Sequence, residues 1–70
     1  MNAWTIYYED LNDYGTVKQL TQSSELAAKR KCRHLLAIGM NTFQIEGPSG
    51  IIQVGRRNAR NKIDWTDYYR

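Results

Sequence analysis

The side chains best suited to chemistry in this chain are its single cysteine and single histidine, Cys32 and His34. Residues two apart on a helix point in different directions, so these two cannot form a nucleophile–base pair by themselves. The acids Glu9, Asp10 and Asp13 lie close together but lack the ligand spacing of an EF-hand, and they are typical of a solvated turn. We therefore predict that the protein is not an enzyme and uses no metal or cofactor.

A helix is expected across Ser23 to Gly39, which has a clear helical period. Ser23 or Ser24 can cap its first turn, and Gly39 can adopt the left-handed conformation that ends many helices. The apolar positions share one narrow face, and cationic positions with His34 surround the rest. The apolar face holds Ala28, Cys32, Leu35 and Leu36, and the cations are Lys29, Arg30, Lys31 and Arg33.

Short runs of aromatic and β-branched residues on both sides of the helix predict strands. These strands span 3–9, 16–21, 41–46, 51–55 and 62–68, with turns at 11–15 and 47–50. The order β-β-α-β-β-β predicts an α+β fold, in which one helix packs on one face of an antiparallel sheet of four to five strands. Residues 1–70 form a single domain.

The predicted core lies between the helix and the sheet. Val17 is its inward residue in the second strand, and Leu20 is out of phase with Val17, which suggests a bulge or an early strand end. Ile52 and Val54 are expected to face the helix. The full predicted core is Trp4, Ile6, Tyr8, Val17, Ala28, Cys32, Leu35, Leu36, Phe43, Ile45, Ile52, Val54, Ile63 and Trp65, with Thr5, Tyr7, Gln44, Gln53 and Asp64 on the open side of the sheet.

Length and composition favour a cytoplasmic protein. One cysteine cannot form an internal disulfide, and the longest uncharged run, 35–45, is too short to span a membrane. The first ten residues carry acids where a signal peptide needs Lys or Arg. The expected location is therefore the cytoplasm.

The net charge of +3 is concentrated in two basic clusters, one on the helix and one in the segment RRNARNK. Such clusters suit an acidic or polyanionic partner, although surface charge can also serve only solubility. Tyr7, Tyr14, Tyr68 and Tyr69 are candidate surface anchors, or rings half-covered along the strands. The predicted partner-binding residues are Lys29, Arg30, Lys31, Arg33, His34, Arg56, Arg57, Arg60, Tyr7 and Tyr68.

The chain resembles a compact family of phage-encoded anti-CRISPR proteins that act on type I-F systems. The resemblance lies in the opening MNAWTIYYE, the return strand with its threonines, SSELAAKRK at the start of the helix, NTFQIEGPSGIIQV and KIDW. It implies binding to the backbone subunits of a Cascade-like surveillance complex, which blocks target DNA. A member of the family contacts DNA through lysines, which the basic helix could repeat. Because the chain is basic, inhibition would work by steric block, with Glu9, Asp10 and Asp13 meeting cations on the partner.

Two functional hypotheses follow. The first is a non-enzymatic phage-type inhibitor of a host CRISPR surveillance complex, located in the host cytoplasm. The alternative is a small nucleic-acid-binding or regulatory module that uses the basic helix and RRNARNK. A monomer is compatible with both hypotheses, and so is a homodimer joined through the open sheet face or an edge strand.

Overall fold

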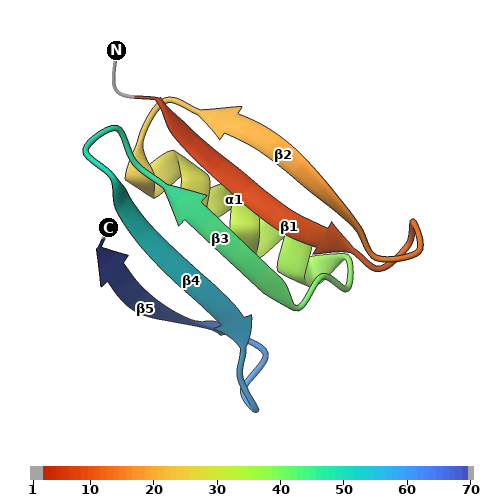
Figure 1. Ribbon diagram of the computed structural model, residues 1–70. Helices are drawn as coiled ribbons and strands as arrows, with labels where there is room; N and C mark the ends of the chain where they lie inside the picture. The colour runs from red at the N-terminus through yellow and green to blue at the C-terminus, as the bar shows by residue number, and fades with distance from the viewer. Residues whose placement is uncertain (1–2, 70) are drawn as a thin grey trace.

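The protein consists of one helix on one face of a five-stranded antiparallel sheet, seen in a computed structural model that describes residues 3–69 (Figure 1). The strand order in the sheet is β2-β1-β3-β4-β5. This arrangement confirms the predicted α+β class and element order. The elements are β1 (Trp4–Asp10), β2 (Thr16–Gln22), α1 (Glu25–Ala37), β3 (Thr42–Glu46), β4 (Ile51–Arg57) and β5 (Ile63–Tyr69).

Helix α1 begins and ends at the residues that the sequence predicts. The Ala27 N–H donates a hydrogen bond of 3.1 Å to Ser24 Oγ, so Ser24 is the N-cap. At the other end, Gly39 has a φ of 103°, a conformation that favours glycine and turns the chain out of the helix. The buried face is the predicted one: Ala28, Cys32, Leu35 and Leu36.

Helix α1 covers only part of the sheet. It packs on β1, β2 and β3, and the hairpin of β4 and β5 extends beyond it (Figure 1). The core between helix and sheet is closed at one end by Met40, which follows the helix. The buried apolar residues are Ile6, Ala28, Cys32, Leu35, Leu36, Met40, Phe43 and Ile45, with Trp4, Tyr8, Leu20, Ile63 and Trp65 packed partly buried against them.

The predicted orientation of β2 is wrong. Val17 is 68% exposed, whereas Leu20 packs against the core. The register with β1 runs without interruption from Trp4 opposite Gln22 to Asp10 opposite Thr16, so β2 does not end early. Leu20 lies opposite the buried Ile6, and this partner determines which face of β2 points inward.

The predicted orientation of β4 is also wrong. Gln53 pairs with the inward Ile45, and Gly55 pairs with the inward Phe43, so Ile52 and Val54 lie on the open face. Two contacts on the helix side of the sheet fit this orientation of β4. The Gln53 amide donates a hydrogen bond to Glu25 of α1, and Trp65 lies against Gly55. An apolar strand thus presents its polar residue and its glycine to the helix.

The turn between β4 and β5 begins after Arg57, because Arg56 and Arg57 belong to β4. Asn58 organises the turn: its Oδ1 accepts the N–H groups of Arg60 and Lys62 at 2.8 and 3.1 Å. Its Nδ2 donates to Asp64 Oδ1 at 2.9 Å. Within residues 3–69, no helix has the length and apolar character needed to cross a membrane.

Candidate anion-binding groove

An open groove of about 840 Å³ lies between α1 and the β4–β5 hairpin. It exists because α1 packs on β1, β2 and β3 and does not cover β5. The inward side chains of β5 are therefore only partly buried. We call this surface the basic groove, because the described residues that line it include cations but no carboxylate. Its cations are Lys29, Arg33, Arg57 and Lys62, and its principal apolar side chains are Leu26, Leu36, Ile63 and Trp65.

Helical spacing brings the cations of α1 to this groove. Leu26, Lys29 and Arg33 are three and four residues apart, so they lie on one side of α1, next to its buried face. Lys62 reaches the groove from the β4–β5 turn. The groove therefore gathers positive charge from segments that are far apart in the sequence, a suitable arrangement for an extended anion.

Lys29 is held between a carboxylate and an aromatic ring. Its Nζ is 3.2 Å from Glu25 Oε1 and lies over the Trp65 ring, 5.4 Å from the centroid. Gln53 Nε2 donates to the same Glu25 oxygen at 2.6 Å, and this bond, with Lys29, lowers the pKa of Glu25. Gln53 is 6% exposed, and its Oε1 has no hydrogen-bond partner among the described residues.

Arg57, a predicted binding residue, has a structural role. Its Nη2 donates to the carbonyl oxygens of Leu36 at 2.7 Å and Met40 at 3.3 Å, where α1 ends. Its Nε donates to Asn41 Oδ1 at 2.7 Å, and its Nη1 donates to Asn61 Oδ1 at 3.1 Å. The guanidinium thus ties the end of α1 to the β4–β5 turn and has little capacity left for a ligand.

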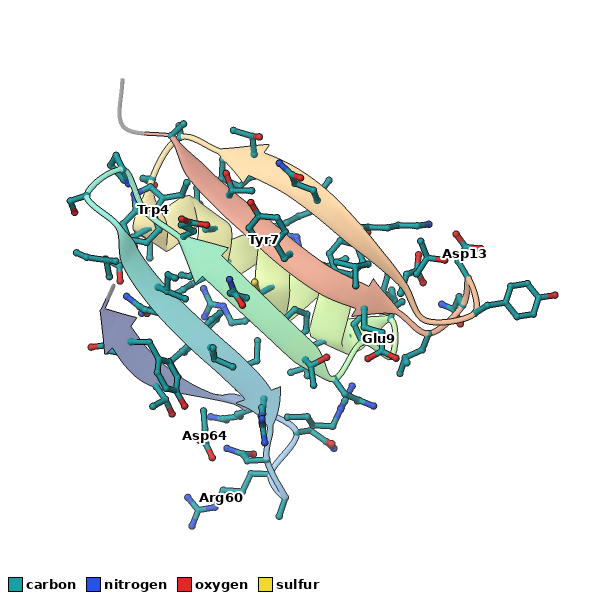
Figure 2. The ribbon with its side chains drawn as sticks, in the orientation of Figure 1. Trp4, Tyr7, Glu9, Asp13, Arg60 and Asp64 are labelled. Carbon is teal, nitrogen blue, oxygen red and sulfur yellow. The ribbon has the colours of Figure 1, made fainter. Side chains whose placement is uncertain are left out.

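The other predicted cations surround the groove or lie away from it. Arg33 lines the groove, whereas Arg30 and His34 are exposed on α1 and Lys31 is half-buried, all outside the lining. Figure 2 shows Arg60 in the β4–β5 turn, where it is exposed. The predicted set is therefore not one site, and the structure brings Lys29, Arg33 and Arg57 together.

The remaining predicted binding residues lie on the open face of the sheet. Tyr7 stands on this face in Figure 2. Tyr7 and Arg56 both line a shallow depression of about 270 Å³ on the same face. Val17 and Val54 line the same depression. Tyr68, 54% exposed, pairs with Ile52 farther along the face. Tyr14 in the β1–β2 turn is fully exposed, and the side chain of Tyr69 lies outside the described residues.

The acids at the β1–β2 turn are paired within the chain. Lys18 Nζ is 2.8 Å from Asp10 Oδ2 and 3.2 Å from Asp13 Oδ2, and its hydrogen bond lowers the pKa of Asp10. Figure 2 places Asp13 and Arg60 in different turns, at well-separated corners of the molecule. The negative charge of Asp10 and Asp13 therefore lies away from the basic groove, whereas the carboxylate of Glu25 pairs with the groove cation Lys29.

The structure keeps Cys32 out of reach of a substrate. Burial raises the pKa of the Cys32 thiol to about 12, so the nucleophilic thiolate is scarce at neutral pH. Between residues 3 and 69, no three His, Cys, Asp or Glu side chains are placed to hold a metal ion. What the described surface offers is cations beside an aromatic ring, an arrangement suited to binding.

Sequence reasoning missed the role of Trp65, which it assigns to the core alone. It names Lys62 only as part of the RRNARNK segment of the alternative hypothesis, outside the predicted partner-binding set. A usable signal was the position of Lys62, Ile63 and Trp65 in a strand next to RRNARN, because an aromatic residue among cations is typical of nucleic-acid surfaces.

No protein-family model, curated protein or solved structure matches this chain. Support for a function therefore comes from the groove and its charges.

Proposed function

We propose that this protein is a non-enzymatic binding protein that holds nucleic acid in the basic groove. The observation that carries the proposal is the convergence of Lys29, Arg33 and Lys62 around Trp65, with no carboxylate among the described lining residues. None of the described ion pairs involves Arg33 or Lys62, so both are available to phosphates. Phosphate contacts release counterions, and they give a binding constant that falls with salt.

Binding to a single-stranded oligonucleotide should weaken steeply as salt rises. Contacts from Lys29, Arg33 and Lys62 predict a slope of about −2 in a plot of log K against log salt, at roughly 0.7 per phosphate. Raising salt from about 50 to about 200 mM should thus cost roughly 20-fold in affinity. Fluorescence anisotropy with a labelled oligonucleotide measures both quantities.

Arg33→Gln should reduce that slope by about 0.7 and weaken binding at low salt. Arg56→Gln is the matched control, since it removes the same charge from the open face. If both variants lose the same affinity, the net charge of the protein accounts for binding and the groove does not.

A second candidate function is the one that the resemblance implies, a stoichiometric inhibitor that binds a CRISPR surveillance complex in the host cytoplasm. The open sheet face favours a protein partner, because the uncharged side chains of Tyr7, Val17 and Val54 line its shallow depression together with Arg56. Exposed aromatic and aliphatic side chains beside Arg are common in protein interfaces. The pairing of Asp10 and Asp13 with Lys18 argues against mimicry of DNA.

The second candidate predicts that the protein co-elutes in size-exclusion chromatography with a purified, nuclease-treated type I-F complex. Val17→Asp should abolish co-elution, because it places a charge in the interface at a position that is exposed in the free protein. Arg33→Gln, which alters the groove, should leave co-elution intact. Absence of a stable complex with the wild-type protein would refute this candidate without touching the first.

A further inference from the structure

The indole of Trp65 rests on a glycine and faces the basic groove. Gly55 and Trp65 are cross-strand partners, and a Cβ at position 55 would lie 2.8 Å from Trp65 Cζ3 and 2.9 Å from Cε3. The six-membered ring therefore lies against the β4 backbone, where only a glycine leaves room. With one side supported in this way, the ring is partly buried and still lines the groove.

The ammonium group of Lys29 lies over this ring, and both residues line the groove. Lys29 is held there by the ring and by Glu25, and the side chains of the ion pair are 32% and 44% exposed. Such an ion pair is weak in water and is screened by salt. Exposed side chains change rotamer within nanoseconds, so Lys29 can leave the ring whenever a stronger anion is at hand.

We propose that Trp65 is a stacking surface for one unpaired base of single-stranded nucleic acid, and that Lys29 covers it in the free protein. This inference rests on the proposed function of the groove. When a strand binds, the Lys29 ammonium exchanges the Glu25 carboxylate for a phosphate, and the uncovered indole receives the base that adjoins this phosphate. Arg33 and Lys62 contact the flanking phosphates. No covalent bond is made or broken.

The chemistry favours single strands over the other anions that could enter. In a duplex both faces of each base are already stacked on neighbouring bases, so no base face is free to stack on the indole. An acidic peptide of Asp and Glu offers carboxylates to the cations but no planar ring to stack on the indole. A single strand supplies both a phosphate and a free base within one nucleotide, as the pairing of Lys29 with Trp65 requires.

The test uses Trp65 as its own probe. Trp4 and Trp65 are the tryptophans of the chain, so Trp4→Phe leaves Trp65 as the only tryptophan, which can be excited at wavelengths where the tyrosines absorb little. Oligo(dT) and oligo(rU) should quench this emission and bind about 5- to 150-fold more tightly than an abasic phosphodiester of the same length and charge. The abasic strand should bind through its phosphates without quenching. Should Trp4→Phe fold poorly, Trp65→Phe in the natural chain must lose the quenching that the wild type shows.

The cover is tested separately with acrylamide, a neutral quencher. Lys29→Ala should make Trp65 more accessible to acrylamide in the free protein, whereas Arg30→Ala, one residue along α1 and outside the groove, should not. If Lys29→Ala leaves the accessibility of Trp65 to acrylamide unchanged, Lys29 does not cover the Trp65 ring in the free protein. Quenching of Trp65 by either oligo(dT) or oligo(rU) supports the inference.

The outcomes separate this inference from the proposed function. Equal affinity for the abasic and the base-containing strands, with unchanged Trp65 emission, would overturn stacking and leave phosphate binding in place. Binding of polyglutamate of matched charge as tight as that of oligo(dT) would also overturn it. If no strand binds at low salt, both the inference and the proposed function fail.

Discussion

Gly55→Ala should lower the melting temperature of the protein by about 10 °C or more, the change expected for a loss of about 2 kcal/mol in a domain of this size. The added methyl group would lie 2.6 Å from Ile63 Cγ2 and 2.8 Å from Trp65 Cζ3, closer than any stable contact between such atoms. To relieve these close contacts, Trp65 and Ile63 must move away from β4, and this movement separates β5 from β4. Thermal unfolding followed by circular dichroism measures the loss.

Gly47→Ala is the matched comparison, because its methyl group would lie 2.7 Å from Cη2 of the other tryptophan, Trp4. This variant should be destabilised to a similar extent, whereas the emission of Trp65 and the properties of the basic groove should be preserved. A Gly55→Ala protein as stable as the wild type would show that Trp65 does not lie against β4 in solution.

Arg57→Ala should cost about 2 kcal/mol of the free energy of unfolding, since it removes charge-assisted hydrogen bonds, two of them to part-buried carbonyl oxygens at the end of α1. The acceptors involved are the carbonyls of Leu36 and Met40 and the side-chain oxygens of Asn41 and Asn61. A cation at the C-terminal end of α1 also interacts favourably with the helix dipole. Urea unfolding gives the change directly.

Arg56→Ala is the control for this loss. It removes the same charge from the adjacent residue of β4, which is exposed on the open face, and should change stability by less than about 0.5 kcal/mol. Arg57→Lys should recover only a small part of the lost stability, because an ammonium group cannot reach all the acceptors that the planar guanidinium hydrogen-bonds at once. Equal losses from Arg56→Ala and Arg57→Ala would contradict the structural role of Arg57.

The helix and the element order were predictable because their signals are local. Ser24, Gly39 and the apolar stripe of α1 each act within a few residues, and the structure has them as predicted. The inward faces of β2 and β4 were not predictable in this way. Their phase depends on partners in other elements: Ile6 opposite Leu20, and Glu25 beside Gln53. Hydropathy alone assigns Val17, Ile52 and Val54 to the core and is wrong for each.

The candidate site shows the same limit. Sequence identifies the cations of α1, but it cannot tell Arg56 from Arg57, which point to opposite faces of β4 and have different surroundings. It also cannot place Trp65 under Lys29, because that contact joins α1 to a strand more than thirty residues away and needs the space left by Gly55. The groove is a product of tertiary packing.

The strand order has a consequence for how the chain assembles. β1 with β2, β3 with β4, and β4 with β5 are neighbours in sequence, so these pairings close short loops and can form early. The pairing of β1 with β3 encloses β2 and α1, and it is the step that joins the N-terminal and C-terminal halves of the fold. One wall of the groove belongs to each half. A partly folded chain in which the two halves have not joined would still expose its charged side chains, but Lys29 and Trp65 would not be in contact.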